Sequence, residues 1–332
     1  METVHSRYAK VLAGERPDDR LPLFEVVWWD QTIRRWESEG LPQGMDEAQT
    51  KTYFGLDVDH HLTFGQFGPG APPWPAHGQP FIRNEAEYEA LLPHLYPDPP
   101  PFDPAEWGRH QRAQDEGRAI VWFNLNGFFW WPRVLLGIEN HLLAFYDQPA
   151  LMHRINRDQV CYLRRCIGAL CAVARPIMMS FWEDLSYNHG PMLSRAMFDE
   201  FLAPYYRLIM PELEARGIVP LLDSDGQIEP IIPWFEGVGI RGCGPLERMA
   251  GVDVNQIRRN HPAWIMQGGF DKLVMPRGEG AMRAEFERIL PAMRAGRFFP
   301  SVDHQTPPGV SLANYRIYRR LQDEYAALAV RK

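Results

Sequence analysis

The stretch from residue 119 to residue 222 decides the fold. It contains three short apolar runs, AIVWFNL at 119–125, IMMSFW at 177–182 and VPLL at 219–222, separated by long amphipathic segments. Runs that are almost continuously apolar are typical of parallel strands covered on both faces. The intervening segments predict helices over residues 132–146, 149–174 and 194–216. Repeated alternation of strand and helix indicates a parallel α/β architecture.

Outward from this stretch, the same alternation extends to both ends of the chain. Further strands are predicted at 21–29, 62–64, 239–242, 264–268 and 298–302, with a terminal helix at 311–330. About eight strand–helix units fit, so we expect an α/β fold of the (β/α)8 TIM-barrel type, forming a single domain over residues 1–332. An open doubly wound sheet is the alternative. It has little support because the chain carries neither G-x-G-x-x-G after its first strand nor G-x-x-x-x-G-K-[ST].

A proline-rich segment interrupts the pattern in the N-terminal third. It contains PGAPPWP at 69–75 and YPDPPPFDP at 96–104, with a short helical piece near 85–92. We expect residues 66–117 to form an ordered insertion within the barrel rather than a linker. Trp74, Phe81 and Tyr96 are the side chains expected to anchor it.

Composition excludes several classes of partner. The net charge of -7 gives no basic field for a phosphate backbone, so nucleic acid is not an expected partner. The N-terminus lacks the apolar core of a signal peptide, and no apolar run is long enough to span a bilayer. Four cysteines in a chain of this length favour a reducing compartment, so we expect a cytoplasmic protein without membrane contact.

Three of the cysteines, Cys161, Cys166 and Cys171, lie five residues apart on one predicted helix. This spacing rotates each thiol away from the last, which disfavours a shared metal. We interpret them as buried helix cysteines.

The functional residues of a (β/α)8 barrel lie at the carboxyl ends of its strands. Five carboxylates fall at predicted strand ends and should converge on one mouth: Glu183, Asp184, Asp223, Asp225 and Asp303. Carboxylates held close together raise one another's proton affinity, so the cluster indicates acid/base chemistry or a bound metal. We expect catalytic roles for Glu183, Asp223, Asp225 and His304, metal ligation by Asp223, Asp225 and Asp303, and substrate contacts from Trp28, Asn124, Asn126, Trp182 and Tyr187.

Each of these assignments has a structural alternative. Asp225 can cap a short helix, and Asp303 with His304 can form a turn before the following prolines. The tryptophans can fill the core, and the polar cluster can be free of metal. Glu183 is preferred to its neighbour Asp184 because adjacent side chains point in different directions.

Three other features are interpreted as structural. Glu139 can favour the dipole at the start of a helix. Cys243 stands in a Gly-Cys-Gly turn with no recognisable base partner, and the His60-His61 pair lies in a poorly patterned region.

Several stretches together resemble the uroporphyrinogen decarboxylase superfamily. They are RYAKVLAGERPDDRLPLF, LLGIENHLLAFYDQPALMHRI, SFWEDLSYNHGPMLSRAMFDEFLAPYYRLIMPEL, LLDSDGQIEPIIPWFEGVGIRGCGPLERMAG, GGFDKLVMPRG and VDHQTPPGVSLANYRIYRRL. The resemblance covers nearly the whole chain and is weakest over residues 65–117. It implies either cofactor-free decarboxylation of uroporphyrinogen or methyl transfer involving a corrinoid, with zinc activating a thiol acceptor in one branch.

The chain departs from both patterns. The decarboxylases carry M-R-Q-A-G-R after the first strand, where this sequence reads VVWWDQTIRRW with Arg34 and Arg35 nearby. The zinc methyltransferases carry H-x-C-G after the fifth strand, where this sequence reads D-S-D-G at residues 223–226. They carry a further cysteine after the eighth strand, at a position that here falls at or near Asp303. Carboxylates are hard ligands that suit magnesium, calcium or manganese, and they also hold zinc, particularly if His304 contributes.

The sequence therefore favours an enzyme of the methyltransferase branch. It would move a methyl group from a small methylated or methoxylated substrate to a corrinoid, with a divalent metal such as zinc at the mouth. No corrinoid-binding D-x-H-x-x-G motif is present, so the corrinoid would come from a separate corrinoid protein. One alternative is a cofactor-free decarboxylase or lyase acting on a small organic acid or tetrapyrrole, and another is a non-catalytic barrel that binds a tetrapyrrole or small molecule. The resemblance also implies a homodimer.

Overall fold

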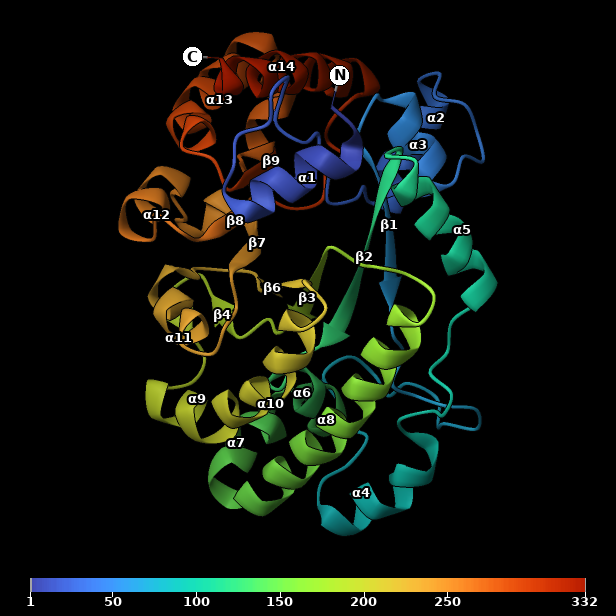
Figure 1. The fold of residues 1–332 in the computed structure, drawn as a ribbon. Coiled ribbons are helices and arrows are strands. Elements are labelled where there is room, and N and C mark those ends of the chain that lie inside the picture. The colour runs from blue at the N-terminus through green and yellow to red at the C-terminus, as the bar shows by residue number, and fades with distance from the viewer. Residues whose placement is uncertain (1, 332) are drawn as a thin grey trace.

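The computed structural model describes residues 2–331, so Met1 and Lys332, the two ends of the predicted domain, lie outside the described residues. Seven parallel strands form one curled sheet in the order β1-β2-β3-β6-β7-β8-β9 (Figure 1). Their bounds are β1 (Val58–Thr63), β2 (Ala119–Asn126), β3 (Met178–Trp182), β6 (Val219–Asp223), β7 (Gly242–Leu246), β8 (Ile265–Phe270) and β9 (Phe298–Val302).

The segment 21–29 fills the gap between the two edges of this sheet. On one side the Asp57 amide donates to the Leu23 carbonyl at 3.1 Å. On the other side the Thr306 amide donates to the Val27 carbonyl at 3.4 Å, and Trp28 pairs in parallel with Thr306. The predicted first strand is thus extended chain held at a few points, and the fold is the expected TIM-barrel type.

Helices surround the strands and connect them (Figure 1). Their bounds are α1 (Val4–Ala13), α2 (Asp30–Ser38), α3 (Glu47–Tyr53), α4 (Glu85–Leu91), α5 (Pro104–Asp115), α6 (Trp130–Leu136), α7 (Ile138–Asp147), α8 (Pro149–Cys171), α9 (Arg195–Phe201), α10 (Ala203–Glu214), α11 (Ile232–Glu236), α12 (Val254–Asn260), α13 (Glu279–Arg294) and α14 (Leu312–Val330). A short hairpin, β4 (Ser186–Tyr187) and β5 (Gly190–Pro191), follows the carboxyl end of β3.

Local sequence explains where several helices begin and break. The Ser194 hydroxyl accepts from the Met197 amide and starts α9, and Pro204 lies in the first turn of α10, where the predicted single helix divides. The predicted helix 132–146 also divides, at Gly137, whose φ of 74° ends α6. A Cβ on Gly137 would lie 2.6 Å from the Gly78 carbonyl oxygen, so the proline-rich segment packs directly on this break.

Two sequence predictions need correction. The strand expected at 239–242 begins only at Gly242, because the amides of Val238, Gly239 and Ile240 bond back to α11. Cys166 is buried as expected, but Cys161 is exposed. Five residues correspond to more than one helical turn, so successive thiols face different directions.

The proline-rich segment is fastened by aromatic contacts. Tyr96 accepts a hydrogen bond from the Trp131 indole N–H at 2.8 Å. Trp74 remains 70% exposed, although its ring contacts those of Phe67 and Phe81. Tyr96 is therefore a firmer anchor than Trp74.

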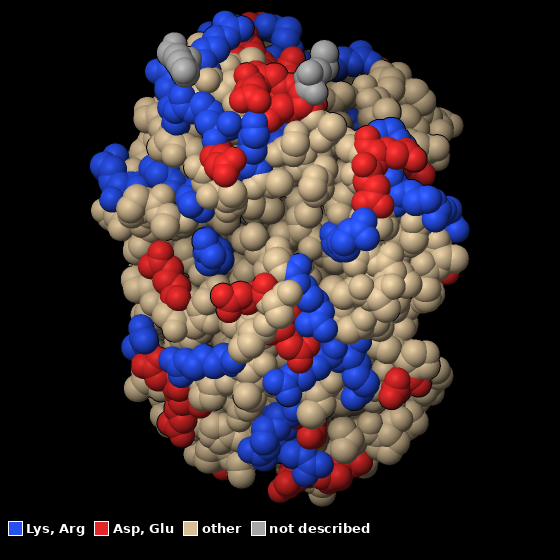
Figure 2. Space-filling view, viewed as in Figure 1, with Lys and Arg blue, Asp and Glu red and all other residues tan. Residues whose placement is uncertain are grey.

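Acidic and basic side chains are interspersed over the face drawn in Figure 2, without a continuous basic stripe. Within residues 2–331, no helix combines the length and the apolar character required to cross a membrane.

Candidate active site

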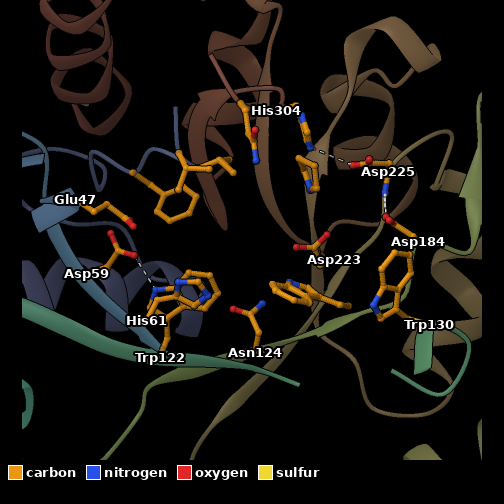
Figure 3. Close-up of a pocket in the computed structure, with 16 residues that line it drawn as sticks. Glu47, Asp59, His61, Trp122, Asn124, Trp130, Asp184, Asp223, Asp225 and His304 are labelled. Carbon is orange, nitrogen blue, oxygen red and sulfur yellow. Dashed lines mark hydrogen bonds and ion pairs between the residues drawn. The ribbon is translucent and has the colours of Figure 1, made fainter. Parts of the chain in front are cut away.

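A cavity of about 270 Å³ opens toward the carboxyl ends of the strands, and we call it the mouth cavity (Figure 3). Its walls combine indole and apolar side chains with carboxylates. The lining residues are Phe24, Val26, Val27, Glu47, Asp59, His61, Trp122, Asn124, Trp130, Trp182, Asp184, Asp223, Asp225, Pro245, His304 and Gln305.

One side of the mouth cavity carries a cluster of acidic groups and one imidazole. His304 Nε2 lies 3.6 Å from Asp225 Oδ1, and the Asp225 amide donates to Asp184 Oδ1 at 3.3 Å. Glu247, which directly follows β7, accepts from the Gly226 amide at 3.1 Å. One ligand atom from each of Asp225, Glu247 and His304 lies within 4.8 Å of the other two. Two carboxylate oxygens and one imidazole nitrogen suit zinc or manganese, and three ligands leave coordination positions open.

Asp223 and Asp225 resist ionisation when no cation is near. Burial, followed by the charges of Asp184 and Asp225, raises the pKa of Asp223 well above its ordinary value. Burial, with Asp184 and Glu247, raises the pKa of Asp225 to about 7. Burial lowers the pKa of His304, so its imidazole is neutral near neutral pH and can act as a ligand. A bound cation would relieve the repulsion and displace protons from the aspartates.

The opposite side of the mouth cavity is built around a buried lysine. Lys51 Nζ lies 2.6 Å from Glu47 and 2.6 Å from Asp59, and the Trp122 indole N–H donates to Asp59 at 2.7 Å. The His61 ring stacks on Trp122 with centroids 4.5 Å apart. Figure 3 shows Glu47 and Asp59 across the cavity from Asp225 and His304.

Asn124 lies between these two sides and points into the mouth cavity (Figure 3). Its position on β2 places it on the same face as Trp122, two residues earlier. The side chain is 1% exposed and its Oδ1 has no hydrogen-bond partner. Buried polar atoms are nearly always paired, so this oxygen is a candidate acceptor for a group bound in the cavity.

Backbone geometry holds the acidic side in place. Asp184 has a φ of 42°, a conformation that non-glycine residues adopt at an energetic cost and that recurs at functional sites. Gly226 has a φ of 82°, and a Cβ there would meet the Tyr187 backbone at 2.7 Å. The loop carrying Asp225 therefore lies directly against the β4–β5 hairpin.

Six of the residues expected at the mouth come together in the mouth cavity. They are Asn124, Trp182, Asp184, Asp223, Asp225 and His304.

Glu183 lies elsewhere, because its carboxylate is fully buried beneath the start of α6. It accepts from the amides of Phe128, Phe129 and Trp130 at 2.8–2.9 Å, and from the Tyr206 hydroxyl. Its adjacent residue Asp184 faces the cavity instead. The expectation that Glu183, rather than Asp184, faces the mouth is therefore wrong.

Asp303, predicted as a metal ligand, is also buried away from the cavity. It forms an ion pair with Lys272 at 3.3 Å and accepts from the Arg248 amide at 3.0 Å. These contacts tie the loops after β7 and β8 together. Glu247 and His304, rather than Asp303 and Asp223, accompany Asp225 in the candidate ligand set.

Three predicted substrate contacts lie outside the cavity lining. Trp28 packs against Trp36, Phe54 and Tyr315. Asn126, the last residue of β2, donates to Gln66 instead. The third, Tyr187, is half exposed on the β4–β5 hairpin.

The sequence did not reveal several lining residues, chiefly Glu47, Asp59 and His61, together with the nearby Glu247. The D-V-D-H-H stretch held a usable signal, because Asp59 and His61 alternate on one face of β1. Glu247 was missed because the strand predicted at 239–242 ends well before it, whereas β7 runs from Gly242 to Leu246.

Comparisons with known proteins agree with this fold. The family model described as "Uroporphyrinogen decarboxylase (URO-D)" matches residues 135–325, more than half of the chain. A uroporphyrinogen decarboxylase from Bordetella parapertussis is 25% identical over 276 residues, covering 77% of this chain and 73% of that protein. The structure of a methyltransferase from Methanosarcina mazei superposes with a TM-score of 0.68 at 14% identity, covering 98% of this chain and 99% of that one. With the parallel barrel and the matched sequence taken together, the chain belongs to the uroporphyrinogen decarboxylase family.

Proposed function

We propose that this protein is a methyltransferase that takes a methyl group from a small methylated compound in the mouth cavity and passes it to a corrinoid carried by another protein. The observation that carries the proposal is the charge of the cavity. Five carboxylates line it, Glu47, Asp59, Asp184, Asp223 and Asp225, and among the described residues no arginine or lysine does.

This lining disfavours decarboxylation of an organic acid. A substrate carboxylate needs arginine, lysine or several N–H donors around it, and here it would be placed beside like charges. Lys51 is the nearest buried cation on that side, and it is already paired with Glu47 and Asp59. A polycarboxylate such as a uroporphyrinogen would be repelled more strongly than a monoacid.

Asp225, Glu247 and His304 are the residues that would hold a divalent metal. When bound, such an ion would act as a Lewis acid toward the group that carries the methyl. The other residues of the mouth cavity bind and orient the substrate. Trp122, Trp130 and Trp182 supply apolar surface, and Asn124 offers a free acceptor oxygen.

The methyl acceptor must approach from outside the cavity. A volume of about 270 Å³ holds a small molecule but is too small for a corrin ring as well. The substrate's methyl group must therefore point outward, while its remaining atoms lie against the indoles and carboxylates.

Absorbance spectroscopy tests the proposal. The protein, with zinc or manganese, is mixed with cob(I)alamin and a panel of methylated amines, methoxylated compounds and methylated thiols, and methylcobalamin formation is followed. We expect one class to react, with kcat/KM about 100-fold lower in Asp223→Asn and unchanged in the surface control Asp199→Asn.

No methylcobalamin from any donor class would count against methyl transfer. Release of carbon dioxide from a carboxylic acid would replace it with decarboxylation.

A further inference from the structure

We propose that the substrate is a small methylated ammonium ion, whose cationic head lies between the indoles of the mouth cavity and the carboxylates of Asp184 and Asp223. This inference rests on the proposed methyl transfer and assigns its substrate class.

Negative charge remains in the mouth cavity after its internal ion pairs are counted. Lys51 offsets one of the two charges of Glu47 and Asp59. A divalent ion at Asp225, Glu247 and His304 would offset two more. Asp184 and Asp223 still face the cavity without a basic partner among residues 2–331. The cavity therefore favours a positive ligand even with metal bound.

Aromatic rings supply much of the apolar surface of the mouth cavity. Trp122, Trp130, Trp182 and Phe24 line the same cavity as the carboxylates. Methylated ammonium ions bind such rings through cation–π attraction and bury their methyl groups against them. Donation from Trp122 to Asp59 makes this indole more electron-rich and strengthens the attraction. A hydrated inorganic ion would gain nothing from the indoles, and a neutral ether would gain nothing from the carboxylates.

The side-chain oxygen of Asn124 is unpaired. The Asn124 side chain lines the cavity between the two acidic sides, and its buried Oδ1 has no hydrogen-bond partner (Figure 3). An acceptor here complements the N–H of a protonated methylamine or the polarised methyl hydrogens of a quaternary ammonium.

The chemistry of the leaving group agrees with this choice. The electron pair of the reduced corrinoid forms the new bond to the methyl carbon, and the carbon–nitrogen bond breaks with its pair retained by nitrogen. A neutral amine leaves, so no proton has to be supplied. That amine loses its attraction to the carboxylates, which favours release. A methoxy donor would instead leave an alkoxide or phenoxide beside the acidic groups.

Isothermal titration calorimetry without corrinoid tests the inference on the full-length protein, both metal-free and zinc-loaded. The probes are tetramethylammonium, trimethylammonium, choline and 3,3-dimethylbutan-1-ol, the uncharged carbon analogue of choline. We expect choline to bind at least about tenfold more tightly than its analogue. Asp223→Asn and Trp182→Leu should each weaken choline binding, whereas Trp182→Phe should retain most of it and Asp199→Asn all of it.

Equal binding of choline and 3,3-dimethylbutan-1-ol would overturn the inference. Choline binding that Trp182→Leu weakens but Asp223→Asn leaves unchanged, with the thermal unfolding of both variants intact, would overturn it as well. Because this titration contains no methyl acceptor, its failure is separable from that of the proposed function. Ammonium binding without methylcobalamin formation would refute methyl transfer alone. Transfer from a neutral methoxy donor without ammonium binding would refute the substrate class alone.

Discussion

At the scale of single residues, the site depends on aspartates that are costly to ionise. Asp223 points into the mouth cavity, and Asp225 lies beside His304 (Figure 3). Burial and mutual repulsion raise the pKa of both carboxyl groups. A cation that binds here must displace those protons, and its charge then neutralises the repulsion between the carboxylates. Cation binding at these aspartates should therefore be accompanied by the release of protons.

The affinity for a cation should consequently rise with pH. Asp225 has a pKa of about 7 and is faced by Asp184, Asp223, Glu247 and His304, with Lys272 nearby. Below this pKa a cation must displace a proton, so affinity should increase by up to about tenfold per pH unit for each proton displaced, and should level off above it. The lowered pKa of His304 keeps its ring neutral through this range. Titration with zinc between about pH 6 and 8 measures the effect.

In Asp225→Asn the slope of affinity against pH should flatten. A wild-type affinity that is independent of pH across this interval would contradict the displacement of protons.

Glu183 shows how an acidic residue beside the site can be structural. Its carboxylate accepts three backbone amides at the start of α6 and the Tyr206 hydroxyl, all without solvent. Glu183→Gln places an NH₂ group against those donors, and we expect the free energy of unfolding to fall by about 2–4 kcal/mol. Urea unfolding measures this loss, with the exposed Glu116→Gln as control. A stable variant with selectively lost activity would instead indicate a catalytic role.

At the scale of elements, the positions of the strand ends could be predicted from sequence, but the side chains that face the cavity there could only partly be predicted. The apolar runs located β2, β3 and β6, and their carboxyl ends place Asn124, Trp182 and Asp223 together. The choice between Glu183 and Asp184 could not be made from sequence, because it depends on the positive φ of Asp184 and on the amides of α6 that hold Glu183.

Asp303 and Glu247 illustrate the same limit. Asp303 follows β9 as predicted, yet Lys272 and two backbone amides hold it in the core. Glu247 became visible only when the start of β7 was known. Tertiary partners decide which side of a strand end faces the cavity, and a single sequence does not specify them. The extended conformation of segment 21–29 and the helix break at Gly137 likewise depend on contacts with residues that are distant in the sequence.

The contact between the Asp225 loop and the β4–β5 hairpin can be tested at Gly226. Gly226→Ala would bring a Cβ within 2.7 Å of the Tyr187 backbone, at a φ of 82°. We expect a loss of about 1–3 kcal/mol in the free energy of unfolding and weaker metal binding, because Asp225 must move. Gly280→Ala, in α13 and with open space around its Cβ position, is the matched control. Unchanged metal affinity in Gly226→Ala would mean that this close contact does not position Asp225.

At the scale of the whole molecule, closure of the barrel brings distant segments to one cavity. The candidate metal ligands follow β6, β7 and β9, and the opposite wall comes from α3 and β1. A metal at Asp225, Glu247 and His304 would therefore connect three parts of the barrel. An ion that binds only the folded chain stabilises it in proportion to the logarithm of its concentration.

Metal removal should accordingly lower the thermal stability of the protein. At a free metal concentration of about 100 times Kd, the expected stabilisation is about 2.7 kcal/mol. Scanning calorimetry with and without zinc or manganese measures the shift in Tm. Glu247→Gln should reduce metal affinity by about tenfold or more, and Glu116→Gln should leave it unchanged. Equal Tm values with and without each metal would remove this site from the proposal.

The most direct test of methyl transfer follows the methyl carbon itself. Tetramethylammonium labelled with ¹³C is incubated with cob(I)alamin and the protein, and ¹³C NMR records where the label resides. We predict that the label moves from nitrogen to cobalt at the same rate as trimethylamine appears. Asp223→Asn should slow this transfer, whereas Asp199→Asn should not. A label that stays on nitrogen, while calorimetry shows the ammonium ion bound, would contradict methyl transfer and leave the mouth cavity as a binding site for cations.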